Sequence, residues 1–166
     1  MPVLAHAARA SLLTAAATLC LVAPGHAADD PPAAAPRQAA SADLLGEARK
    51  FIAGKQWAAA IDELQRVNAT QNADWNNLMG YSHRKARTPD LIAAARHYEA
   101  ALRIDPNHRG ALEYAGELAL MRGDLGMAEQ RAAALSTACG GRCEELDDLK
   151  GAITRFKANG NRYVEK

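Results

Sequence analysis

Residues 73–108 read ADWNNLMGYSHRKARTPDLIAAARHYEAALRIDPNH, and this stretch decides the fold of the chain. Apolar and small residues recur in it at helical spacing, which predicts two short amphipathic helices joined by a turn. Two antiparallel helices approach closely only where the residues that face each other are small. We therefore expect Gly80 to pack against Ala94. The second helix should end at Asp105-Pro106-Asn107, because proline does not continue a helix.

The turn inside this stretch, residues 84–89, is two residues longer than its counterparts on either side. Thr88 is a good N-cap residue, and Pro89 suits a first helical turn, where no backbone N–H is needed. We therefore expect the second helix to begin at these two residues.

Similar helix pairs flank the central stretch. The first pair presents one apolar face before the turn at 54–57 and one after it: Leu44, Ala48, Phe51 and Ile52, then Ala60, Ile61, Leu64 and Val67. The third pair does the same around the turn at 123–125: Leu112, Gly116 and Ala119, then Ala128 and Leu135. By the same packing argument, Ala48 should face Ala60 and Gly116 should face Ala128.

Five residues of the central stretch stand where a tetratricopeptide repeat places its small, aromatic and terminating residues: Gly80, Ala94, Tyr98, Ala101 and Pro106. Residues 41–138 resemble three such repeats, at 41–72, 73–108 and 109–138. The resemblance implies an all-α fold, an α-solenoid in which stacked repeats bury each other's apolar faces.

The segment 139–160 follows the third repeat with a cysteine-containing turn and a helix expected over Glu144–Asn159. One apolar stripe runs along that helix: Leu146, Leu149, Ile153 and Phe156. Such a helix would cap the last repeat, and residues 161–166 would form a tail. The runs HRGALEYAGELALMRGDLGMAE and CGGRCEELDDLK also resemble small exported bacterial tetratricopeptide proteins that carry a C-x-x-x-C-E-E motif. That resemblance implies an envelope location and a binding role.

The segment 1–27 has the features of a signal peptide: Arg9, a short apolar run and a small-x-small ending. We expect cleavage between Ala27 and Ala28, and hence a periplasmic or secreted protein. The apolar run is shorter than the roughly 20 residues that a membrane span needs. Residues 28–40 are rich in alanine and proline and read as a disordered linker. The first helix should follow Ser41 as its N-cap.

The charge balance bears on the class of partner. The chain has 20 basic and 19 acidic residues. Because the leader holds Arg9 and no acid, the mature chain carries 19 of each. Phosphate binding needs a basic surplus, so a nucleic-acid partner is not expected. A stable membrane anchor after cleavage is not expected either. The expected partner is therefore another protein or a peptide, and the sequence does not indicate which one.

Two cysteines remain after cleavage, Cys139 and Cys143, and three interpretations are open. An exported protein with an even cysteine count favours a structural disulfide. A redox-active dithiol is a second reading, although the spacing exceeds Cys-x-x-Cys by one residue. Haem or metal binding is a third, although Glu144 stands where haem attachment would place a histidine. A thiol-dependent redox or metal-handling protein is therefore the alternative function.

The sequence offers little for catalysis, and we do not expect an enzyme, a cofactor or a metal site. His83, His97 and His108 lie on three different expected elements. Glu113 and Glu117 lie one helical turn apart, but no base or nucleophile accompanies them, so a solvated helix face is the interpretation.

A binding surface is better supported. Stacked repeats form a concave groove lined by the first helix of each pair. Its expected lining residues are Arg49, Asn77, Tyr81, Arg84, Lys85, Glu113, Glu117 and Met121. An extended peptide or partner helix would use Tyr81 as an anchor and Asn77 for its backbone. The sequence therefore predicts a non-enzymatic adaptor of the bacterial periplasm. The alternative is that these residues merely solvate the inner face.

Overall fold

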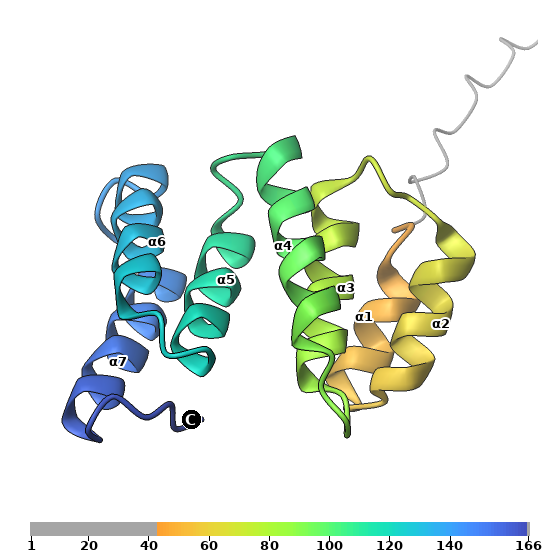
Figure 1. Cartoon of the computed structure of the whole chain (residues 1–166). Coiled ribbons are helices and arrows are strands. Elements are labelled where there is room, and N and C mark those ends of the chain that lie inside the picture. The colour runs from red at the N-terminus through yellow and green to blue at the C-terminus, as the bar shows by residue number, and fades with distance from the viewer. Residues whose placement is uncertain (1–42, 166) are drawn as a thin grey trace, which may run out of the picture. The chain divides into compact units, whose positions relative to one another are not determined.

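The computed structural model describes residues 43–165, which form seven α-helices and no strand within that range. The helices are α1 (Gly46–Ala53), α2 (Trp57–Val67), α3 (Ala73–Lys85), α4 (Leu91–Ile104), α5 (Arg109–Met121), α6 (Leu125–Ala138) and α7 (Glu144–Ala158), as Figure 1 shows. The all-α class is confirmed. The expected signal peptide and linker lie outside the described residues. The prediction of Ser41 as the N-cap of the first helix is wrong, because the N-cap of α1 is Leu45. None of the helices in the described part is long and apolar enough to span a membrane.

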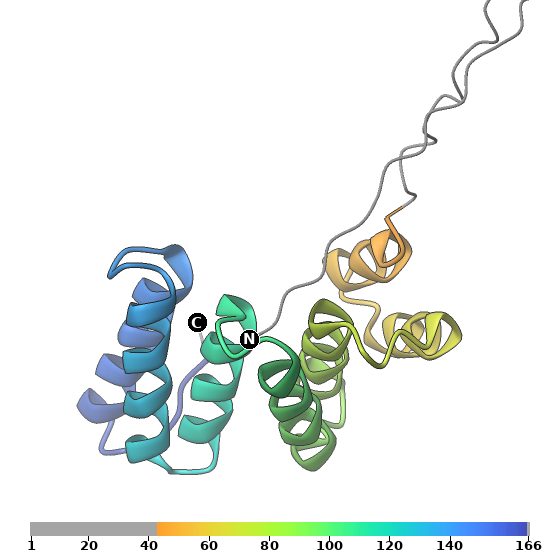
Figure 2. The same ribbon diagram turned by 90° about the horizontal axis from the view of Figure 1, so that it is seen from above.

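The helices stack in chain order. Each helix packs against the next, and α1, α3, α5 and α7 also contact one another in succession. We call α1, α3, α5 and α7 the layer of odd-numbered helices, and α2, α4 and α6 the layer of even-numbered helices. Figure 2 shows the stack from above. The helices fall in the three expected pairs, followed by one more helix. The layer of odd-numbered helices therefore provides a continuous surface that three or four helices share.

The last helix covers the apolar side of α5 and α6. The four residues of its expected stripe are all buried: Leu146, Leu149, Ile153 and Phe156. They join one core cluster with residues of the preceding pair, among them Leu112, Leu120 and Leu135. Without α7 this cluster would face water, so α7 stabilises the pair by burying apolar area.

The start of α1 differs from the sequence expectation. Leu44, expected in the core, is 60% exposed, whereas Leu45 is 3% exposed and belongs to a cluster with Trp75. The helix begins only at Gly46. Before it the chain turns, with the Asp43 backbone carbonyl accepting from the Gly46 N–H at 2.9 Å. A residue in that turn does not follow helical periodicity, so the spacing argument fails there.

The start of α4 also lies later than expected. Thr88 and Pro89 precede the helix, and the N-cap is Asp90. Its carboxylate accepts hydrogen bonds from the Ile92 N–H at 3.1 Å and the Ala93 N–H at 2.9 Å. A carboxylate satisfies these free donors and also interacts favourably with the positive end of the helix dipole.

Two glycines let helices approach closely, but the nearest side chain of each differs from the one expected. A Cβ atom on Gly80 would lie 2.6 Å from the Tyr98 ring, one turn after Ala94 in α4. A Cβ atom on Gly116 would lie 2.7 Å from Leu149 of α7. The group that presses on Gly116 is thus the capping helix, and not Ala128 of α6.

The turn between α6 and α7 holds the two cysteines as expected. Cys139 and Cys143 form a disulfide, with Cα atoms 6.0 Å apart. Gly140 and Gly141 between them have φ of +63° and +86°, a conformation that side chains disfavour. The disulfide therefore closes a tight turn at the N-terminus of α7.

Candidate functional site

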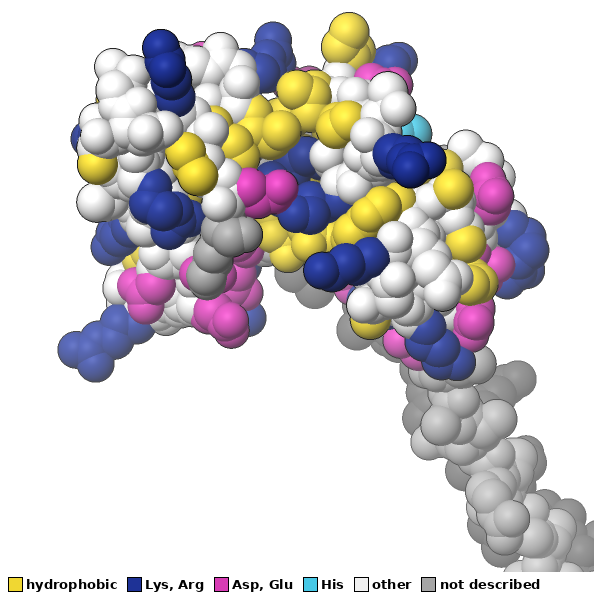
Figure 3. Space-filling view, turned by 90° about the horizontal axis from the view of Figure 1, so that it is seen from below, with side chains coloured by type: hydrophobic (Ala, Val, Ile, Leu, Met, Phe, Trp, Pro, Cys, Tyr) yellow, Lys and Arg dark blue, Asp and Glu magenta, His cyan; other side chains and the backbone are white. Residues whose placement is uncertain are grey.

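A depression lies where the C-terminal ends of α3 and α5 meet the start of α2. Its lining residues are Lys55, Trp57, Tyr81, Arg84, Lys85, Ala86, Pro89, Met121 and Glu165. We call it the α3–α5 depression. Figure 3 shows the molecule from below, with a hollow in which Lys and Arg side chains lie among apolar ones. Four of the eight expected groove residues therefore line one site: Tyr81, Arg84, Lys85 and Met121.

Tyr81 lies at the centre of an aromatic row in this depression. Its ring lies 5.8 Å from that of Trp57 in an edge arrangement and 4.7 Å from that of Tyr114. Tyr81 is half-buried. Aromatic rings in such contact hold each other in place. Trp57 and Tyr81 thus give the depression a preorganised apolar wall from α2 and α3, and Tyr114 of α5 supports Tyr81.

Arg84 and Glu117 form a buried ion pair behind this row. The guanidinium and carboxylate are 2.8 Å apart, and the two side chains are 3% and 15% exposed. The guanidinium also lies 5.6 Å from the ring centre of Tyr81 and 5.4 Å from that of Tyr114. The interpretation of Glu117 as part of a solvated face is therefore wrong. Because α3 and α5 each supply one charge, the pair fixes how these helices meet.

Glu113 is buried as well, with 8% of its surface exposed. Burial is the largest cause that raises the pKa of its carboxyl from 4.5 to about 8, and the charges of Glu117 and Asp148 act in the same direction. Glu145 adds to this effect, and Arg84 opposes it. The solvated-face interpretation fails here too, because the packing of α3 and α7 around α5 removes water from the carboxyl.

Asn77 lies in the same buried layer, 8% exposed. A Cβ atom on Gly110 would lie 3.0 Å from its Nδ2, so the absence of a side chain in α5 makes room for it. Within residues 43–165 its Oδ1 has no hydrogen-bond partner. Asn77 is thus an internal polar residue between α3 and α5, and not the open groove residue that was expected.

Arg49 belongs to a polar network at the other end of the odd-numbered helices. It pairs with Asp43 at 2.8 Å and with Asp74 at 3.2 Å. The His108 Nε2 lies 2.9 Å from the Asp74 carboxylate, and its Nδ1 accepts from the Ala111 N–H at 3.1 Å. His108 therefore caps α5 while donating to α3. Arg49 is not brought together with Tyr81.

His83 and His97 meet, although the sequence placed them on separate elements without a link. Their rings stack with centres 5.7 Å apart and planes 9° apart. Burial is the main cause that lowers the pKa of both, and the charge of Arg96 acts in the same direction. Both imidazoles are therefore favoured in the neutral form. In the described range 43–165, no group of three or more His, Cys, Asp or Glu side chains is placed to hold a metal ion.

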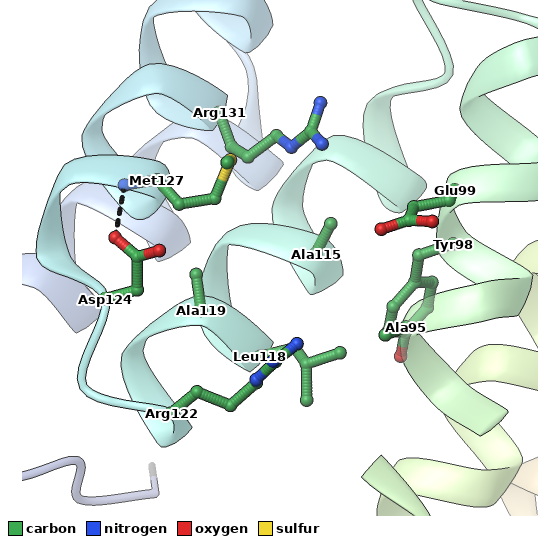
Figure 4. A pocket seen from close by; sticks show the side chains of 10 residues that line it. All are labelled: Ala95, Tyr98, Glu99, Ala115, Leu118, Ala119, Arg122, Asp124, Met127 and Arg131. Atoms are coloured by element: carbon green, nitrogen blue, oxygen red, sulfur yellow. Dashed lines mark hydrogen bonds between the residues drawn. The ribbon is translucent and has the colours of Figure 1, made fainter. Parts of the chain in front are cut away.

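A second depression lies on the other layer, between α4, α5 and α6 (Figure 4). It is lined by Ala95, Tyr98, Glu99, Ala115, Leu118, Ala119, Arg122, Asp124, Met127 and Arg131. The dashed line marks the Asp124 carboxylate accepting from the Met127 N–H at 2.9 Å, which caps α6. The eight expected groove residues do not line this depression. Its carboxylates and guanidiniums lie around small apolar residues, and we assign it no role.

Sequence reasoning does not find Trp57 and Glu165, which line the α3–α5 depression, or Tyr114, which contacts Tyr81. It places Trp57 in a turn, although the aromatic side chain is a signal for a binding surface. Glu165 gave no local signal, because its partner Lys85 lies 80 residues earlier in the chain.

The chain matches no family model, and a comparison with curated proteins gives no match. The site must therefore be interpreted from its own geometry.

Proposed function

We propose that this protein is a non-enzymatic interaction scaffold, an exported tetratricopeptide-type adaptor that binds a peptide or partner protein in the α3–α5 depression. Its repeats would be 41–72, 73–108 and 109–138, with 139–160 as the cap. The bacterial periplasm is the proposed location, where a disulfide such as Cys139–Cys143 persists.

The two-layer stack supports this proposal. Short helix pairs joined in series leave one layer as a shared surface, and repeat proteins of this kind use such surfaces to bind partners. The residues on that surface come from several helices: Trp57 from α2, Tyr81 from α3 and Met121 from α5. A ligand there would contact three elements that packing already holds in register.

The observation that carries the proposal is the half-buried ring pair of Trp57 and Tyr81, which lines the depression together with the cation of Lys85. Tyr81 is also held by its contact with Tyr114. Aromatic residues in preformed hollows are typical centres of binding energy, because they bury much area and lose little side-chain entropy. An adjacent cation adds orientation to the contact.

The test is co-purification from envelope extracts with the exported protein as bait. We expect Tyr81→Ala to lose proteins that the unsubstituted bait recovers. The matched control is Ile92→Ala, because Ile92 is 73% exposed on α4 and does not line the depression. Thermal melting of both variants separates lost binding from lost folding. Equal recovery by the Tyr81→Ala and Ile92→Ala baits would remove the depression from the proposal.

A further inference from the structure

The chain reverses direction after α7. Gly160 and Asn161 have φ of +65° and +59°, and the Asn161 N–H donates to the Phe156 carbonyl at 2.9 Å. Two successive left-handed residues end the helix and send the chain back across the molecule. In Figure 1 the chain runs from the end of α7 back below α5.

The tail that follows contacts the body with alternate residues. Tyr163 is half-buried against the core cluster of α5, α6 and α7, whereas Val164 is 47% exposed. The Glu165 carboxylate pairs with the Lys85 Nζ and lines the depression beside Trp57 and Tyr81. Residues 162–165 form no helix or strand. Two tail side chains thus contact the body, that of Tyr163 by packing and that of Glu165 by its ion pair with Lys85.

From this arrangement we propose that the tail, residues 161–165, is a built-in ligand of the α3–α5 depression. The external partner is then a peptide with the same chemistry: an aromatic side chain that packs on the core cluster of α5, α6 and α7, followed two positions later by a carboxylate that enters the depression. The part that concerns the external partner rests on the proposed function, whereas the docking of the tail stands on its own contacts.

The charges explain why a carboxylate is recognised there. Arg84 is already paired with Glu117, so the cation that faces the ligand is Lys85. The side chains of Lys85 and Glu165 are 26% and 57% exposed. An ion pair as exposed as this contributes little by itself. The tail is therefore held weakly enough for a partner of the same chemistry to displace it.

The burial of Tyr163 adds to the selectivity. Its pKa is raised mainly by burial and also by the charge of Glu117, while Arg84 acts in the opposite direction. A neutral phenol thus lies near the Arg84–Glu117 pair.

The experiment measures peptide binding to the purified exported chain by fluorescence anisotropy. The probe is a fluorescein-labelled, C-terminally amidated peptide with the sequence of residues 161–165, NRYVE. The tail is released in the variant Tyr163→Ser, Glu165→Gln. A tethered segment competes at an effective concentration in the millimolar range. We therefore expect the released variant to bind the probe at least about threefold more tightly than the unsubstituted chain.

Charge reversal supplies the controls. In the released variant, Lys85→Glu should abolish binding of NRYVE and should permit binding of the reversed peptide NRYVK. The matched control, Lys150→Glu, changes an exposed lysine of α7 away from the depression and should leave binding unchanged. Equal affinity for the released and unsubstituted chains would overturn the inference. So would equal effects of Lys85→Glu and Lys150→Glu.

A second measurement does not depend on the double variant, which loses a core contact of Tyr163. In the unsubstituted chain the heteronuclear NOE of the Val164 and Glu165 amides should be close to that of the helices, and Glu165→Lys should lower it. NOE values that are high only at high protein concentration would indicate that the tail docks on a second copy of the chain. That result would overturn docking within one chain.

The two proposals fail separately. Probe binding as expected, together with unchanged envelope recovery by Tyr81→Ala, would keep the docked tail and remove the adaptor function. The opposite outcome is also possible: Tyr81→Ala loses envelope proteins, but the released variant binds the probe no more tightly than the unsubstituted chain. The adaptor function would then stand, and the tail would not be a mimic of the partner.

Discussion

Replacing Glu113 by glutamine should make the stability of this protein less dependent on pH. The side chain is 8% exposed, and burial is the main cause that raises its pKa from 4.5 to about 8. The folded protein therefore binds this proton more tightly than the unfolded chain. The stability that the protonated carboxyl contributes is present below pH 4.5 and is lost as the pH rises to about 8.

The magnitude follows from the shift. At about 1.4 kcal/mol for each pKa unit, the rise from 4.5 to about 8 corresponds to roughly 5 kcal/mol of unfolding free energy. Glutamine has nearly the same shape and does not titrate. The free energy of unfolding of Glu113→Gln, relative to the unsubstituted protein, should thus increase by up to about this amount between pH 4.5 and 8.

The assay is urea unfolding of both proteins at several pH values. His83 and His97, whose pKa values are lowered mainly by burial, make stability rise with pH just below their ordinary range, but they are common to both proteins and cancel in the difference. Glu129→Gln is the exposed control, since Glu129 is 50% exposed on α6. If the curves for Glu113→Gln and the unsubstituted protein run parallel across this range, Glu113 is not a buried carboxyl.

Two further predictions concern the packing. Gly80→Ala should destabilise by about 1–3 kcal/mol through overpacking against Tyr98, despite alanine's better helix propensity. The control Gly126→Ala, with no atom closer than 3.7 Å to the new Cβ, should leave melting unchanged or raise it; a rise for Gly80→Ala would contradict the close contact. Replacing Cys139 and Cys143 by serine should lower stability by about 2 kcal/mol, from the short loop that the disulfide closes. Peptide binding should persist, and its loss in a folded variant would favour the thiol-dependent function.

The helix pairs were predictable because their signals are local. Apolar spacing placed Ala60 and Leu64 inside α2, and glycines or proline marked the turns. The same reasoning failed at Leu44 and Leu45, because a helix start depends on which nearby side chain captures the free backbone N–H groups. For α4 that side chain is the carboxylate of Asp90, the residue that follows Pro89.

The candidate site was only partly predictable. The surface that Tyr81 and Lys85 share follows from helical spacing, so both could be placed together. The burial of Glu113 arises from α3, α5 and α7 together, and spacing along one helix carries no information about it. Contacts such as Lys85 with Glu165 join residues far apart in the sequence, and they become visible only in three dimensions.

The central claim is that the partner binds in the α3–α5 depression. Site-specific photo-crosslinking in cells that export the protein tests this claim directly. A photoreactive phenylalanine analogue would replace Tyr81 in one strain and Ile92 in another. We predict a discrete adduct with an envelope protein from position 81, reduced by an excess of NRYVE peptide, and none from position 92. Adducts of equal yield from both positions, or from position 92 alone, would contradict the assignment.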